Sequence, residues 1–304
     1  MLFLISDNSF AIAVCSVCAL AVPLILFFVL KKRSRVSSSE PFWAGVITFI
    51  VFALVLEKLV LLILGKTPFW NSMPFMARVI LTGLLAGFFE ESGCLISMKV
   101  SEYIEEKRRM KAGHEQSGEG KKDIMGAIRT NLDEVREGRD HALMHGLGHG
   151  GAVVIVFGLI MLFNLVYAVL RPDAPGSGVS FSAPAANLIH SALTSYRGVS
   201  VLNIVMSLFE EICALAIHIS LAVLVWFSLQ GGKNRIYFFL SILLHALSDV
   251  LIEIFLESGL SHTMCLLAYL GLTLAIVGFT WGVWNSLEKK EIMKILEAKI
   301  EEQK

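Results

Sequence analysis

Seven long apolar segments divide this 304-residue chain and leave few folds open to it. Each is long enough to cross the hydrocarbon core of a bilayer, which takes about 20 helical residues. A backbone in lipid must satisfy its own hydrogen bonds, so segments of this kind are helices. We therefore predict an all-α, polytopic membrane helix bundle of about seven transmembrane helices. The segments are 9–30, 41–64, 77–99, 141–170, 200–229, 236–257 and 263–285.

Basic residues alternate between rich and poor loops along the chain. Closely spaced Lys and Arg occur in residues 31–35, in residues 100–140, in the short loop at 230–235 and in the tail, whereas the other loops carry two or none. The positive-inside rule then predicts an N-terminus outside and a C-terminus in the cytoplasm. Basic residues follow the first apolar segment and do not precede it, so we interpret it as a membrane helix and not as a signal peptide.

The chain is expected to form a single membrane domain over residues 1–304. Residues 100–140 are predicted to be a cytoplasmic charged segment, residues 171–199 an extracytoplasmic loop, and residues 286–304 a cytoplasmic amphipathic tail. Such a chain belongs in a cell membrane as a multi-pass protein, and we expect a bacterial plasma membrane and the lipid bilayer itself as a partner. The formal net charge is zero, which gives no argument for a nucleic-acid partner.

Ionisable residues inside the apolar segments are the strongest functional signal. A charge at bilayer depth costs several kcal/mol unless it is paired or hydrated, so such residues are functional candidates. Counted inward at 1.5 Å per residue, four of them on four different helices lie roughly 12–17 Å below the cytoplasmic face. We predict that these four, Glu90, His149, His218 and His245, meet in one polar pocket. The other intramembrane candidates are Glu91, His141, His145, Glu210, Glu211, Asp249 and Glu253.

The spacing of these residues suits a metal site. His245 and Asp249 are four residues apart and share one helix face. Neutral imidazoles and carboxylates are common zinc ligands, and a remaining Glu can accept the proton of an activated water. The glycines within Gly146–Gly151 should let helices approach closely. We interpret the isolated Glu57 as facing polar neighbours or an interface.

At these residues the sequence resembles the YhfC family of intramembrane metalloproteases. That family is grouped with the type II CAAX prenyl proteases, the PrsW-type proteases and a γ-secretase scaffold subunit. The resemblance runs from the third apolar segment to the sixth, with its motifs in the same order. The matching motifs are Phe89-Glu90-Glu91, Gly146-Leu-Gly-His149-Gly-Gly, His218, and His245-Ala-Leu-Ser-Asp249.

The resemblance implies a metal-dependent intramembrane endopeptidase that uses a metal-activated water. Its substrates would be membrane-embedded or lipid-anchored peptides or proteins, and its cofactor a divalent metal ion, with zinc expected. The implied roles are catalytic for Glu90, Glu91 and Asp249, metal-binding for His149, His218 and His245, and supporting for His145 and Glu211.

Three positions depart from the family pattern and keep other functions open. Cys94 stands where the family often has Arg, Val153 where a Glu is common, and Ile212 where an Arg is common. A non-catalytic relative that serves as a membrane scaffold or binding protein is one alternative. A proton-coupled transporter is the other, because Asp, Glu and His chains also relay protons. The transporter predicts inverted repeats or a broken helix, which Gly146–Gly151 can supply.

Overall fold

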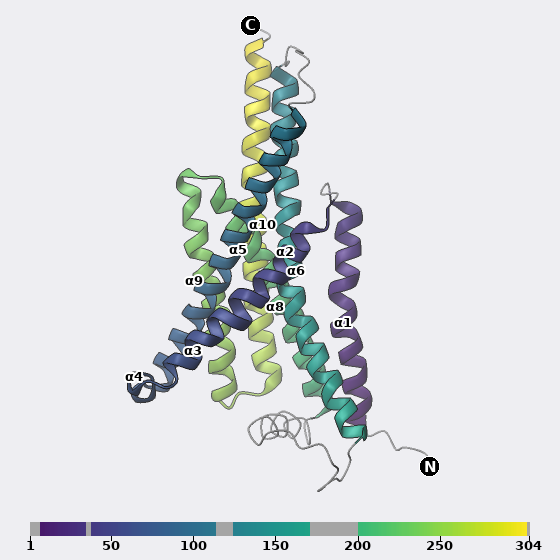
Figure 1. Ribbon diagram of the computed structural model, residues 1–304, viewed down its shortest axis with the longest axis vertical. Coiled ribbons are helices and arrows are strands. Elements are labelled where there is room, and N and C mark those ends of the chain that lie inside the picture. Colours follow the sequence, from purple (N-terminus) through teal and green to yellow (C-terminus); the bar gives the residue numbers. More distant parts are fainter. Residues whose placement is uncertain (1–6, 35–37, 114–123, 171–199, 303–304) are drawn as a thin grey trace.

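The computed structural model describes residues 7–34, 38–113, 124–170 and 200–302, and every regular element within these ranges is a helix (Figure 1). Seven helical stretches are long and apolar enough to cross a membrane, so the predicted all-α bundle is confirmed. The start of α1 and the end of α10 lie at opposite ends of the bundle, as an odd number of crossings requires. Which end faces the cytoplasm stays a prediction. The elements are α1 (Asp7–Arg33), α2 (Glu40–Thr48), η1 (Phe49–Glu57), α3 (Lys58–Leu64), α4 (Pro68–Ser72), α5 (Phe75–Gly113), α6 (Ile124–Leu170), α8 (Val201–Leu229), η2 (Gly232–Arg235), α9 (Ile236–Glu257) and α10 (His262–Glu302).

Three helices continue well beyond the apolar segments that predicted them. α5 extends to Gly113, α6 begins at Ile124, and α10 extends to Glu302. Hydropathy marks where a chain leaves the bilayer, whereas Glu, Lys, Arg, Met and Ala continue a helix in water because their helix propensity is high. Both ends of the charged segment, and the tail as far as Glu302, are therefore helical. The middle of that segment and the whole predicted loop at 171–199 lie outside the described residues.

The second span is built from three pieces. α2 passes into η1, a π-helical stretch of nine residues, and η1 passes into α3. Turns of π-helix are rare and are frequent at functional sites. A π-turn also rotates the residues after it relative to a regular α-helix. The direction of the Glu57 side chain, at the end of η1, therefore differs from the direction that 3.6 residues per turn would predict.

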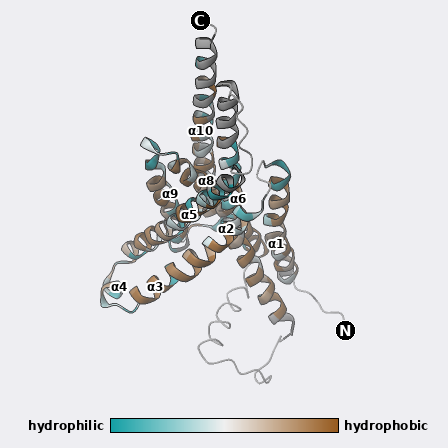
Figure 2. Ribbon diagram, turned by 45° about the horizontal axis from the view of Figure 1, so that its top comes forward, coloured by the Kyte–Doolittle hydropathy of each residue, from teal (hydrophilic) through white to brown (hydrophobic). Residues whose placement is uncertain are grey.

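α8 is the central helix of the bundle. Two thirds of its most apolar window is buried inside the protein (67%), against 22–44% for the other six spans. α8 packs against α6, α9 and α10, while α1 and α2 pack against α6, and α9 also packs against α5. Figure 2 shows hydrophobic residues along α3, which lies at the periphery and belongs to a span of which only 22% is buried. The four helices that carry the candidate residues, α5, α6, α8 and α9, thus share one interior.

Glycines on α6 bring two neighbouring helices into backbone contact. A Cβ at Gly148 would collide with the backbone carbonyl of Phe42 on α2. A Cβ at Gly146 would lie 2.7 Å from the Ile219 Cα on α8, and one at Gly150 would lie 2.8 Å from the His218 Cβ. The prediction that small residues allow close approach around the histidines is confirmed, and this approach sets the distance between His149 and His218.

Gly148→Ala should lower the stability of the protein. The added methyl has no space beside Phe42, so we expect a loss of about 1–3 kcal/mol despite the better helix propensity of Ala. Thermal unfolding in detergent measures the effect. Gly271→Ala on α10 is the matched control, because a Cβ there meets nothing within 4 Å. Equal melting temperatures for the two variants would contradict the close packing of α2 on α6.

Candidate functional site

Glu90 on α5 lies at the middle of a buried polar cluster. The ring of His149, from α6, donates from Nε2 to Glu90 Oε2 at 2.8 Å. His245 Nε2, from α9, is 3.8 Å from the same carboxylate oxygen. All three residues are at least nine-tenths buried. One carboxylate therefore contacts histidines from two other helices.

His218 on α8 completes the cluster. Its ring centroid lies 4.9 Å from that of His149 and 5.1 Å from that of His245. Glu90, His149 and His218 each offer one ligand atom, and these three atoms lie within 4.8 Å of one another. The four side chains predicted to meet from four helices do meet, so this central prediction is confirmed.

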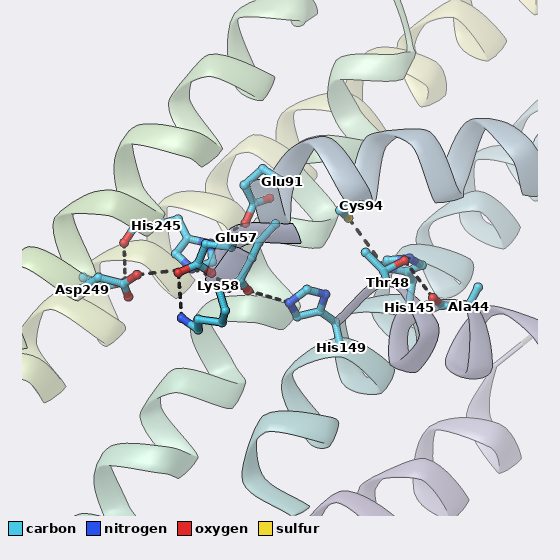
Figure 3. Close-up of polar contacts among 12 residues, drawn as sticks. Ala44, Thr48, Glu57, Lys58, Glu91, Cys94, His145, His149, His245 and Asp249 are labelled. Carbon is cyan, nitrogen blue, oxygen red and sulfur yellow. Dashed lines mark hydrogen bonds and ion pairs between the residues drawn. The ribbon is translucent and has the colours of Figure 1, made fainter. Parts of the chain in front are cut away.

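His245 is held in place by carboxylates on both sides of its ring (Figure 3). Its Nδ1–H donates to Glu91 Oε1 at 2.8 Å. That bond leaves Nε2 facing Asp249 Oδ2, 3.7 Å away, as well as Glu90. A carboxylate that accepts from one imidazole nitrogen fixes the ring and makes the other nitrogen more basic. Three carboxylates around one ring also stabilise a positive charge on it.

A small cavity lies beside this cluster and fits an ion or a water. It measures about 10 Å³, about the least that holds one water molecule. His149 Nδ1 is buried and has no hydrogen-bond partner in the part of the chain that the structure describes. An orphaned buried nitrogen beside a Glu and a second His is suited to a divalent cation, because two His and one Glu form a ligand set of catalytic zinc sites. The cavity is lined by Glu90, Glu91, Cys94, His145, His149, His218 and Ala222.

His145 lies one helical turn from His149 and is fully buried. Its Nε2 is 3.1 Å from Ser97 Oγ and 3.4 Å from Thr48 Oγ1, and its Nδ1 is 3.6 Å from Cys94 Sγ. Thr48 already donates its hydroxyl proton to the Ala44 carbonyl oxygen, so it accepts from His145. Cys94, at the position where the family often has Arg, therefore contacts the site through its thiol.

Glu57 faces polar neighbours, as the sequence analysis expects, but it is also a neighbour of the site, a position that the sequence analysis does not assign to it. Its side chain is 1% exposed, and Figure 3 places it beside His245 and Asp249. Oε1 accepts from Lys58 Nζ at 2.7 Å, while Oε2 is buried without a partner among the described residues. The signal was an acid and a base, adjacent in sequence, in the middle of an apolar span, where an ionisable group is costly.

Other candidates lie apart from the cluster. Glu211 does not line the cavity, and its Oε2 is buried without a partner in the described ranges. Its neighbour Glu210 accepts from His262 Nε2 at 2.9 Å. His141 lies where the charged part of α6 passes into its apolar part, with Nε2 4.0 Å from Glu105 Oε1. α6 continues without interruption through Gly146–Gly151, so these glycines do not supply the broken helix that would favour the transporter alternative.

Comparison with known proteins agrees with the site. Residues 18–113 and 130–270 match the family described as YhfC intramembrane metalloprotease. These two ranges include every member of the cluster. Neither the curated proteins nor the solved structures yielded a match. With most of its length matched, the chain belongs to the YhfC intramembrane metalloprotease family.

Proposed function

We propose that this protein is a metal-dependent endopeptidase that cleaves membrane-associated polypeptides within the bilayer. One observation carries the proposal: Glu90, His149 and His218 place their ligand atoms within 4.8 Å of one another in a buried site. A charged cluster of this kind is costly inside a membrane, so it marks a candidate functional site. The Lys and Arg pattern supports a multi-pass protein of the bacterial plasma membrane with its N-terminus outside.

Glu90, His149 and His218 would hold the ion, for which zinc is the expected metal. Two imidazoles and one carboxylate match the His₂Glu set of zinc peptidases, which leave a further position open. When bound, such an ion supplies Lewis acidity, which lowers the pKa of a water and polarises a peptide carbonyl.

His245 is the residue that we propose accepts the proton from the attacking water. Its Nδ1–H is bonded to Glu91, so Nε2 is the free basic atom and faces Glu90. Asp249, 3.7 Å from Nε2, would stabilise the charged ring, which would then return the proton to the leaving amine. The family resemblance implies that Glu90 is catalytic and that His245 binds the metal. We propose the reverse, with Glu90 as a ligand and His245 as the base, because Glu91 and Asp249 both face His245.

Metal analysis of the purified protein tests the proposal. We expect about one zinc per chain, since a single group of three ligand residues is present in the described ranges. Cleavage of membrane-spanning peptides in vesicles should stop when a chelator removes the metal and resume when zinc is restored. A chain that binds no divalent metal and cuts no peptide from a diverse set would refute the proposed function.

A further inference from the structure

A second, larger cavity lies between α2 and α5. Its volume is about 550 Å³, and η1 forms part of its inner wall. Gly93 and Phe52 both line it, and a Cβ at Gly93 would lie 2.5 Å from the Phe52 ring, so η1 and α5 approach closely there. We call this cavity the α2–α5 groove. It is separate from the small cavity beside Glu90.

The inner end of the groove is one side chain away from the candidate metal site. Thr48 and Ser97 line the groove, and both lie within hydrogen-bonding distance of His145 Nε2, at 3.4 and 3.1 Å. His145 in turn lines the small cavity, together with Glu90 and His149. A molecule in the groove would therefore reach the reacting groups once the His145 ring moved.

The chemistry of the groove changes along its length. Its walls are apolar and include Trp43, Ile47, Ile96 and Val100. The end away from Thr48, called the outer end here, is the one we expect to face the cytoplasm. It carries Glu40, Glu105, Arg108 and His141. Glu40 accepts from Arg108 at 2.9 Å, so two carboxylates face one guanidinium, and with His141 neutral the outer end has one negative charge in excess.

We propose that the α2–α5 groove binds the substrate as an extended polypeptide whose apolar stretch is followed by a basic residue. This inference rests on the proposed function and names the substrate class of the same site. A single extended chain presents its peptide groups to the Thr48 and Ser97 hydroxyls at the inner end of the groove, whereas a helix satisfies its own backbone hydrogen bonds.

Two observations favour a peptide over a lipid tail as the occupant. Extended backbone inside a membrane needs hydrogen-bond partners, and the hydroxyls of Ser97 and Thr48 lie at the inner end, where a hydrocarbon chain has no use for them. The excess negative charge at the outer end complements the Lys and Arg that flank membrane segments on their cytoplasmic side. An anionic headgroup would meet repulsion there.

Photo-crosslinking tests the occupant without requiring cleavage. A photoreactive residue replaces Ile47 in the groove or, as a matched control, Leu274 on α10, both of which are about 60% exposed. The probe is a synthetic peptide in phosphatidylcholine vesicles, with an apolar stretch of Val, Ile and Gly followed by two Lys. Its partner probe ends in two Glu. We expect position 47 to capture the Lys-ended peptide about tenfold more than position 274, and about threefold more than it captures the Glu-ended peptide.

A plug in the groove supplies the second arm. Val100→Trp, which adds bulk at a half-exposed wall position, should lower capture at position 47 by about tenfold, while Leu274→Trp should leave it unchanged. Melting temperatures equal to that of the wild type show that both variants fold. If Val100→Trp does not fold, Ile104→Trp blocks the groove in its place. Capture of phospholipid only, equal capture at both positions, or equal capture of both peptides would overturn the proposal. If the protein binds zinc and cleaves peptides but gives any of these results, its proposed function stands and the assignment of the groove as the substrate-binding site is refuted.

Discussion

His149→Ala is expected to abolish both metal binding and peptidase activity. The imidazole contributes one of three ligand atoms that lie within 4.8 Å of one another, and its removal leaves Glu90 and His218. Substituting a residue that hydrogen-bonds to a metal ligand already lowers metal affinity by about 10–100-fold. Losing a ligand itself should therefore weaken metal binding by more than about 100-fold. A catalytic ion contributes several kcal/mol, so kcat/KM should fall by about a thousandfold or more.

His262→Ala is the matched control for this experiment. It removes a half-buried imidazole that is also bonded to a glutamate, Glu210, at 2.9 Å, but outside the cluster. We expect normal zinc content and normal activity from this variant. Zinc content and peptide cleavage are measured on the same preparations. Retention of stoichiometric zinc by His149→Ala would show that the ion, if it acts at all, is held elsewhere.

Glu90→Gln separates the two assignments of roles within the cluster. If Glu90 is a ligand, as we propose, this variant loses zinc affinity together with activity. If the histidines alone hold the ion and Glu90 is the base, as the sequence resemblance implies, zinc stays and only cleavage is lost. The second outcome would contradict our assignment and leave the metallopeptidase proposal intact.

The meeting of four helices could be predicted because helix geometry fixes depth. A rise of 1.5 Å per residue converts a position in a span into a distance from the membrane surface, so Glu90, His149, His218 and His245 could be placed at one level from the sequence alone. Charge cost then made these residues candidates for a site. The contacts of Glu90 with His149 and His245 agree with that count.

The roles of individual residues could not be predicted in the same way. Adjacent residues on a helix point about 100° apart, and the sequence does not reveal how a helix is rotated. The family resemblance implies a catalytic role for both Glu90 and Glu91, yet one contacts His149 and the other is bonded to His245. The sequence analysis places Glu57 only beside polar neighbours or an interface, because the π-turn of η1, which rotates the end of that stretch, is not visible in the sequence.

Glu91→Gln should lower kcat by about a hundredfold or more while leaving zinc content and KM nearly unchanged. The Glu91 carboxylate accepts from His245 Nδ1 at 2.8 Å, which fixes the ring so that Nε2 is the basic atom. An amide can present its NH₂ to Nδ1 instead, which favours the other tautomer and puts the proton on the nitrogen that must accept one. In a Ser-His-Asp triad, the equivalent Asp→Asn change lowers kcat by about 10⁴ with the geometry intact.

The split between kcat and KM distinguishes positioning from a structural role. A variant that merely loosens the bundle would lose zinc and substrate binding together, since α5 contributes both Glu90 and a wall of the α2–α5 groove. Glu210→Gln is the control, because it alters a second Glu–His pair of similar length between α8 and α10, away from the cluster. We expect its kcat to match that of the wild type. Full activity in Glu91→Gln would mean that His245 does not depend on this carboxylate, and the base would then have to be sought among Glu90, Asp249 and Glu57.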